Sequence, residues 1–121
     1  MIELPPSCVR VERSRARRAV AAALRRRRLQ GDGQPTLVTE FGGTAVGGAE
    51  GWGYETAKTE DDLLSICADQ VGALIDGEIV QGFCYTQLTD IEQEVNGLLT
   101  YDRRHKLDPE KARSITARRA K

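Results

Sequence analysis

The sequence predicts an α/β fold with parallel strands, mainly because of the order of its segments. Two stretches with the composition of β-strands, residues 36–41 and 78–88, alternate with two stretches of helical character, residues 59–77 and 108–118. Strands that alternate with helices are joined by crossovers, which place consecutive strands parallel to one another. Functional groups in such folds gather at the carboxyl ends of the strands, so the residues that follow each strand are the candidates for a site.

The first predicted strand, "TLVTEF" (36–41), contains the apolar pair Leu37 and Val38 and nearly ends on the carboxylate of Glu40. We expect this strand to be buried. Residues 42–53, "GGTAVGGAEGWG", contain six glycines and predict a loop. The pattern therefore places a carboxylate at a strand end, beside backbone that carries little side-chain bulk.

The helix over residues 59–77 has signals at both ends. Thr59 and Asp62 form a capping box, acidic residues fill the first turn, and Gly77 supplies the stop. Apolar residues recur at helical spacing. They predict a buried stripe made of Leu63, Leu64, Cys67, Val71, Leu74 and Ile75.

The second strand, "EIVQGFCYTQL" (78–88), is rich in β-branched and aromatic residues. The last helix begins with Asp108 as its cap and Pro109 at its first position, which is a favoured start. Cys84 in the strand, like Cys67 in the preceding helix, is expected to be a buried apolar filler.

The bulk composition favours one small soluble domain. The chain has 121 residues, of which 30% are charged and 40% hydrophobic, and it contains no run of apolar residues long enough to span a membrane. The N-terminus lacks the apolar core of a secretion signal, so we expect a cytoplasmic protein. Three cysteines without metal-ligand spacing favour reduced thiols and indicate no metal site.

A net charge of zero conceals an asymmetry between the two ends of the chain. Residues 1–28 carry nine arginines and two glutamates, whereas residues 29–121 carry nine basic and sixteen acidic residues. Residues 1–33 are therefore predicted to form a separate basic, Arg/Ala-rich segment that is helical or disordered. Such a segment can bind nucleic acid or another anionic surface. It contains no aromatic residue and the rest of the chain is acidic, so nucleic acid is the weaker alternative.

Glu40 has two interpretations from its local pattern. A carboxylate at a strand end can act as a nucleophile or as a general acid/base, and glycines after it let a substrate approach the backbone. Alternatively, Glu40 is a structural residue that hydrogen-bonds a neighbouring loop.

Three motifs resemble the C-terminal end of the catalytic domain of glycoside hydrolase family 2, the family of β-galactosidases, β-glucuronidases and β-mannosidases. These motifs are "PTLVTEFGG", "GWGYE" and "GFCYTQLTDIEQEVNGLLTYDRRHKLDPEKARSI", and together they cover most of the chain. The resemblance implies that residues 34–118 supply the last two β/α units of a TIM barrel. It also implies a retaining, β-galactosidase-like glycosidase of carbohydrate metabolism that hydrolyses O-glycosyl bonds and needs no cofactor.

The resemblance further implies roles for individual residues. Glu40 occupies the position of the family's catalytic nucleophile. Gln87 would contact the β-glycoside or oligosaccharide substrate, although Thr86 stands where many members have a sugar-binding tryptophan. Trp52 and Tyr54 lie in the glycine loop, where aromatic side chains either stack on a sugar ring or pack the loop onto the barrel.

The family's acid/base residue has no counterpart here. It is the glutamate of an Asn-Glu pair on an upstream strand, and no such pair occurs in this sequence. A general acid contributes a factor of about 10²–10⁴ in rate, so we expect the chain to be inactive alone. We interpret it as a truncated fragment that needs the remainder of the barrel as its partner, or alternatively as a non-catalytic remnant.

Several residues after the second strand carry further expectations. Asp90 is expected to hold its loop by hydrogen bonds, and Asp102 to form a structural ion pair with Arg103. His105 is expected to lie in solvent. β-Glucuronidases have a carboxylate-binding Asn-x-Lys motif near the position where Glu94 stands, so the resemblance implies a neutral hexoside instead of a glucuronide.

Overall fold

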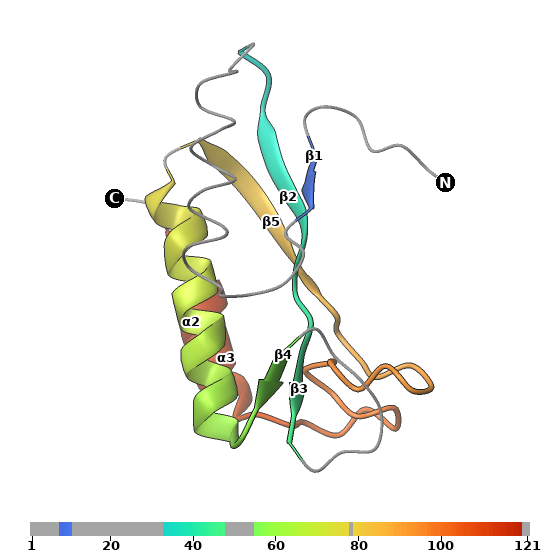
Figure 1. The fold of residues 1–121 in the computed structure, drawn as a ribbon. Helices are drawn as coiled ribbons and strands as arrows, with labels where there is room; N and C mark the ends of the chain where they lie inside the picture. The colour runs from blue at the N-terminus through green and yellow to red at the C-terminus, as the bar shows by residue number, and fades with distance from the viewer. Residues whose placement is uncertain (1–7, 11–32, 48–54, 78, 120–121) are drawn as a thin grey trace.

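The main sheet of the protein is parallel. The computed structural model describes residues 8–10, 33–47, 55–77 and 79–119. Within them, the sheet has the strand order β1 (Cys8–Arg10), β2 (Thr36–Gly42), β5 (Val80–Thr86), and both pairings are parallel (Figure 1). The two predicted strands, their parallel relation and the α/β class are confirmed. The described strands do not close into a barrel.

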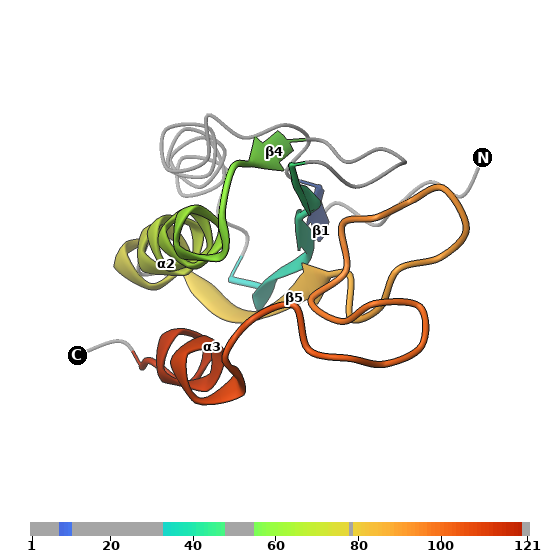
Figure 2. The ribbon, with the colours of Figure 1, turned by 90° about the horizontal axis from the view of Figure 1, so that it is seen from below.

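Two helices lie on the same side of this sheet (Figure 2). They are α2 (Glu60–Asp76), which connects β4 to β5, and α3 (Pro109–Thr116), which follows the long loop after β5. Ile115 of α3 packs against both clusters of buried residues to which α2 contributes, so the two helices share one core. The strand–helix–strand–helix order read from the sequence is therefore the order of the structure.

The helix starts follow the predicted capping chemistry. The amide of Asp62 donates to Thr59 Oγ1 at 3.1 Å, and Asp108 accepts from the first amides of α3. In a complete capping box, the Asp62 carboxylate would accept a hydrogen bond from the amide of Thr59. It accepts one from the amide of Lys58 instead, at 3.2 Å. Gly77 caps α2 with φ −69°, so this helix ends without the left-handed conformation that the glycine suggested.

The core lies between α2 and the adjacent strands. Val38 and Phe41 of β2 are fully or almost fully buried, and they pack against Cys67, Val71 and Leu74 of α2. The Phe41 ring also meets two rings of β5 edge to face, with centroid separations of 5.3 and 5.5 Å. The predicted apolar stripe is confirmed as the sheet-facing side of the helix, because side chains at helical spacing share one face.

Two short strands depart from the sequence prediction. β1 (Cys8–Arg10) lies in the segment that was predicted to be helical or disordered, and it pairs along the edge of β2. β3 (Thr44–Val46) lies in the glycine-rich stretch that was predicted to be a loop, and it pairs in parallel with β4 (Glu55–Ala57). In both cases, backbone hydrogen bonds to a neighbouring strand decide the conformation, and for β1 this partner lies far away in the sequence.

The sheet face opposite the helices is less covered. Leu37 of β2 has 46% of its surface exposed, and Cys84 of β5 is also exposed. The prediction that Cys84 is a buried filler is therefore wrong. Cys84 lies between Phe83 and Tyr85, which pack towards the helices, so the alternation of a strand sends its side chain to the other face.

Candidate functional site

Glu40 lies near the C-terminal end of β2 and is half buried. The side chains of Thr36 and Val38 are buried, and strict alternation would place Glu40 in the same series. The pairing between β2 and β5 shifts register between Val38 and Phe41, so Phe41 takes the next buried place. An irregularity of this kind re-aims the following side chain, and it removes Glu40 from the series that packs on α2.

The two glycines after Glu40 serve the fold. Gly42 has φ +100°, and a Cβ at this position would lie 2.6 Å from Cε2 of Tyr85. Gly43 has φ +75°, and its amide donates to the carbonyl of Thr86 at 2.7 Å. The space beside Gly42 is therefore filled by the Tyr85 ring, which corrects the expectation that this glycine makes room for a substrate.

Gln87 follows β5 directly and lies at the same end of the sheet as Glu40. Its side chain is half buried, and its Nε2 atom is buried without a hydrogen-bond partner among the described residues. The peptide bond between Thr86 and Gln87 is cis, and the carbonyl of Gln87 accepts from the amide of Leu98 at 3.1 Å. The structure thus brings Glu40 and Gln87 to adjacent strand ends, as parallel topology predicts. Trp52 and Tyr54 lie outside the described residues.

Two polar residues that the sequence did not single out are buried in the same region. Thr44 and Asn96 are almost completely inaccessible, and their Oγ1 and Oδ1 atoms have no hydrogen-bond partner among the described residues. Thr44 follows Gly43, which is bonded to the end of β5, and Asn96 lies two residues before the Leu98 amide that binds Gln87. Three such atoms therefore lie near this end of the sheet, on Thr44, Gln87 and Asn96. Each of them costs free energy, because burial removes a polar atom from water without giving it a protein partner.

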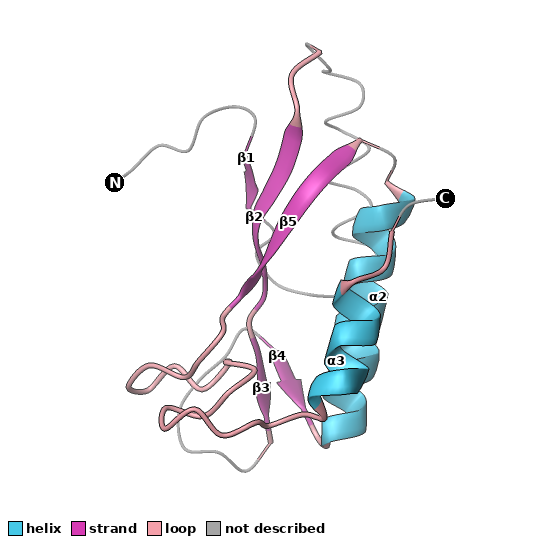
Figure 3. Ribbon diagram, turned by 180° about the vertical axis from the view of Figure 1, so that it is seen from behind, coloured by secondary structure: helices cyan, strands magenta, loops and turns pink. Residues whose placement is uncertain are grey.

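An ion pair holds the loop after β5 in place. Lys106 Nζ donates to Asp90 Oδ1 at 2.5 Å and to the carbonyl of Val95 at 2.9 Å, while the amide of Gly97 donates to Asp90 Oδ1 at 2.9 Å. A Cβ on Gly97 would overlap the backbone next to Asp90, so only glycine allows this approach. The expectation that Asp90 secures its loop is confirmed, and Figure 3 shows this loop extending away from the sheet and the helices.

The ion pair expected for Asp102 has a different partner. Its carboxylate accepts from Arg104 Nε at 2.8 Å, whereas Arg103 donates to the carbonyl of Tyr101. Arg103 has φ +67°, and this backbone turn carries its side chain away from Asp102. Hydrogen bonds from Thr100 and Arg104 lower the pKa of Asp102, which is fully exposed. His105 is exposed, as expected.

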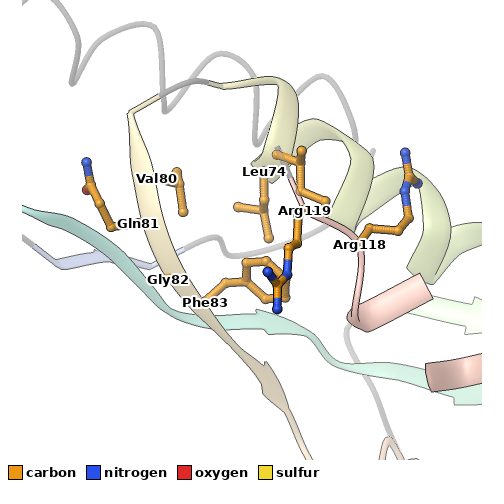
Figure 4. A pocket seen from close by; sticks show the side chains of 8 residues that line it. Leu74, Val80, Gln81, Gly82, Phe83, Arg118 and Arg119 are labelled. Carbon is orange, nitrogen blue, oxygen red and sulfur yellow. The ribbon is translucent and has the colours of Figure 1, made fainter. Parts of the chain in front are cut away.

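A hollow of about 270 Å³ lies at the opposite end of β5 from the candidate site. Figure 4 shows that Leu74 reaches it from α2, that Val80 and Phe83 reach it from β5, and that Arg118 and Arg119 reach it from the segment after α3. The hollow is therefore separate from Glu40. No group of three or more metal-ligating side chains occurs in the part of the chain that the structure describes. None of the described helices is long and apolar enough to cross a membrane.

Comparison with known proteins finds similarity among solved structures. No family model and no curated protein matches the chain. Among solved structures, it is similar to the β-glucuronidase of Bifidobacterium dentium complexed with coumarin-3-O-glucuronide, with 20% sequence identity and a TM-score of 0.55. The match covers 81% of this chain but only 18% of that chain, so this protein spans less than a fifth of its neighbour's length. At this identity the likeness shows a fold shared with part of a glycosidase.

Proposed function

We propose that this chain is the C-terminal part of the barrel of a retaining β-glycosidase, and that Glu40 is its nucleophile. The observation that carries the proposal is the position of Glu40, half buried near the C-terminal end of a parallel strand and removed from the helix-packed series by a register shift. Gln87 is half buried at the adjacent strand end, and we assign it a polar contact to a sugar hydroxyl. The fold similarity to a β-glucuronidase gives independent support.

In this proposal, a carboxylate oxygen of Glu40 attacks the anomeric carbon of the sugar. The bond to the leaving oxygen breaks, and a glycosyl ester on Glu40 forms. The leaving oxygen takes its proton from a second carboxylic acid, which retaining enzymes place about 5–5.5 Å from the nucleophile. Water then attacks the anomeric carbon and gives its proton to the second carboxylate. The bond between the sugar and Glu40 breaks, which releases the sugar and regenerates the Glu40 carboxylate.

We propose that the second carboxylic acid comes from outside the residues that the structure describes. Asp90, which belongs to the same end of the sheet, is engaged by Lys106 and by the amide of Gly97. Both contacts fix this carboxylate within the loop, so Asp90 is not proposed as the proton donor. In this proposal, a partner that completes the barrel supplies the general acid.

Glu94 favours a neutral glycoside as substrate. Its half-buried carboxylate accepts from Asn96 Nδ2 at 3.2 Å, in the loop that follows Gln87. A fixed negative charge repels the carboxylate of a uronate but tolerates the hydroxyls of a hexose.

The test is covalent labelling of Glu40 by a 2-deoxy-2-fluoro-β-galactoside in the presence of a complementary barrel chain. The glycosyl adduct should map to Glu40 by peptide mass spectrometry, and Glu40→Gln should abolish it. A 2-deoxy-2-fluoro-β-glucuronide in a parallel reaction tests the preference for a neutral sugar. An adduct on a different carboxylate would refute the assignment of the nucleophile. Rapid hydrolysis of a nitrophenyl glycoside by the purified chain alone would refute the need for a partner.

A further inference from the structure

One face of the main sheet is covered by no helix among the described residues. α2 and α3 lie on one side of β2 and β5 (Figure 2). Leu37 and Cys84 are exposed, and strand alternation places them on the other side. The Leu37 side chain lies 3.0 Å from the position that a Cβ on Gly82 would take, so it reaches across that face towards β5. Wholly parallel sheets almost always have both faces covered. Among the described residues, helices cover only one face of this sheet.

The composition of this face is that of a buried surface. Before the register shift of β2, its residues on the two strands are Leu37, Thr39, Gly82 and Cys84, and none of them is charged; Glu40 lies beyond the start of that shift, near the strand end. A sheet face that evolved to meet water alternates apolar residues inside with charged or strongly polar residues outside. The exposure of Leu37 and Cys84 is explained if a partner normally covers them.

The outer edge of β5 is also open among the described residues. β5 pairs with β2 on one side, and no other described strand pairs with it. Its seven residues, "VQGFCYT", contain no proline, lysine or other charge, which are the usual devices that block an exposed edge. The far edge of β2, by contrast, is occupied by β1. The chain therefore protects one edge of its sheet with its own N-terminal segment and leaves the other ready to accept a strand.

We infer that the Leu37–Cys84 face and the outer edge of β5 together form a docking surface for a complementary α/β chain. This inference rests on the proposed function, because the same partner would supply the missing general acid. The partner adds a parallel strand to β5 and lays apolar side chains against Leu37. The matched region is only 18% of the neighbouring β-glucuronidase chain, so such a protein holds ample further structure to provide both contacts.

A second copy of this chain fits the surface less well. Two identical β5 edges related by a twofold axis would pair antiparallel, and this edge-to-edge contact would leave both Leu37 faces uncovered. Packing two such faces against each other would cover them but leave both β5 edges open. Only a partner with its own strands and its own hydrophobic core can pair with the outer edge of β5 and cover the Leu37–Cys84 face at the same time.

Cys84 provides a direct footprint of this surface. It is an exposed thiol on the uncovered face, whereas Cys67 is buried in the core and its pKa is raised to about 11 by burial. Thiolates react with maleimides and buried neutral thiols do not, so Cys67 is an internal control for unfolding. The full 121-residue chain is mixed with the Bifidobacterium dentium β-glucuronidase from which the matched region has been deleted. Peptide mass spectrometry then follows maleimide labelling of each cysteine.

The inference predicts a complex on gel filtration and a fall of about tenfold or more in the labelling rate of Cys84 at saturating partner, with Cys67 unreactive throughout. Leu37→Glu should abolish the complex, because docking would bury an unpaired charge. Ile91→Glu is the matched control, since Ile91 is an apolar residue that is 53% exposed and lies on the loop after β5. This control should bind like the natural chain.

Several results would overturn the inference. They are the absence of a complex, a complex in which Cys84 reacts at its free rate, and equal effects of Leu37→Glu and Ile91→Glu. Protection of Cys84 in the chain alone, with elution as a dimer, would assign the surface to a second copy. If Leu37→Glu prevents folding, the footprint of the natural chain still decides the question. A complex that protects Cys84 but leaves Glu40 unlabelled by the fluoro-glycosides would support the docking surface and refute the proposed function.

Discussion

Replacement of Gly42 by alanine should destabilise the protein far more than the same replacement of Gly33. Both residues have positive φ, +100° and +78°, so a side chain is conformationally unfavourable at either position. The space around them differs. A Cβ on Gly42 would lie 2.6 Å from Cε2 of Tyr85 and 3.0 Å from the carbonyl oxygen of Thr86, whereas no atom lies within 4 Å of a Cβ on Gly33.

The expected cost follows from these two contributions. Positive φ costs about 1–2 kcal/mol for a residue with a side chain, and this cost applies at both positions. Insertion of a carbon into a filled space adds about 1–3 kcal/mol at Gly42 alone. The Thr86 carbonyl is already bonded to the Gly43 amide at 2.7 Å, so it cannot retreat without loss of that bond. Gly42→Ala should therefore lower the free energy of unfolding by about 2–5 kcal/mol and Gly33→Ala by about 1–2 kcal/mol.

Urea unfolding followed by far-UV circular dichroism measures both changes. Tyr85→Ala removes the ring that a Cβ on Gly42 would meet, so the cost of Gly42→Ala should fall by about 1 kcal/mol or more in that background. Equal costs at Gly42 and Gly33, or the same cost of Gly42→Ala with and without the Tyr85 ring, would refute the argument that this glycine exists to accommodate Tyr85.

Two further predictions concern buried groups. Lys106 and Asp90 are only 13% and 12% exposed, so Lys106→Met should lower the free energy of unfolding by about 2–4 kcal/mol because it leaves a nearly buried carboxylate without its cation. The double variant with Asp90→Asn should cost less than the sum of the single changes, and additivity in urea unfolding would contradict this. Burial raises the pKa of Cys67 from 9.0 to about 11, so its neutral thiol stabilises the fold fully below pH 9 and this contribution is lost as the pH rises to 11. The free energy of unfolding should fall more steeply between pH 9 and pH 11 in the natural chain than in Cys67→Ala, and parallel pH profiles would contradict the assignment.

The elements that the sequence predicts correctly have local causes. α2 follows from the Thr59 cap and an apolar stripe at helical spacing, and α3 follows from Asp108 and Pro109. The strands that were missed, β1 and β3, depend on pairing with another strand. β1 forms because the edge of β2 offers hydrogen bonds. Its three residues, "CVR", are too few to predict a strand from their sequence alone.

Some features of the candidate site could be predicted from the sequence, and others could not. The position of Glu40 at a strand end follows from parallel topology, which the order of elements reveals. The register shift between Val38 and Phe41 does not follow, because it depends on how β2 meets β5. The role of Gly42 could not be predicted either, since Tyr85 lies more than forty residues away along the chain.

Two residues that the sequence predicts to be buried, Leu37 and Cys84, are exposed in the structure. Leu37 and Cys84 have the apolar character of buried residues, and the sequence places both in the sheet interior, yet both are exposed on one face. These two residues lie on adjacent strands and on the same side, whereas the other large exposed apolar side chains, Leu88, Ile91 and Tyr101, lie in the loops after β5. The uncovered face and the open edge of β5 among the described residues lie on the same strands. A partner that adds a strand to β5 and covers Leu37, as we propose, would account for both features.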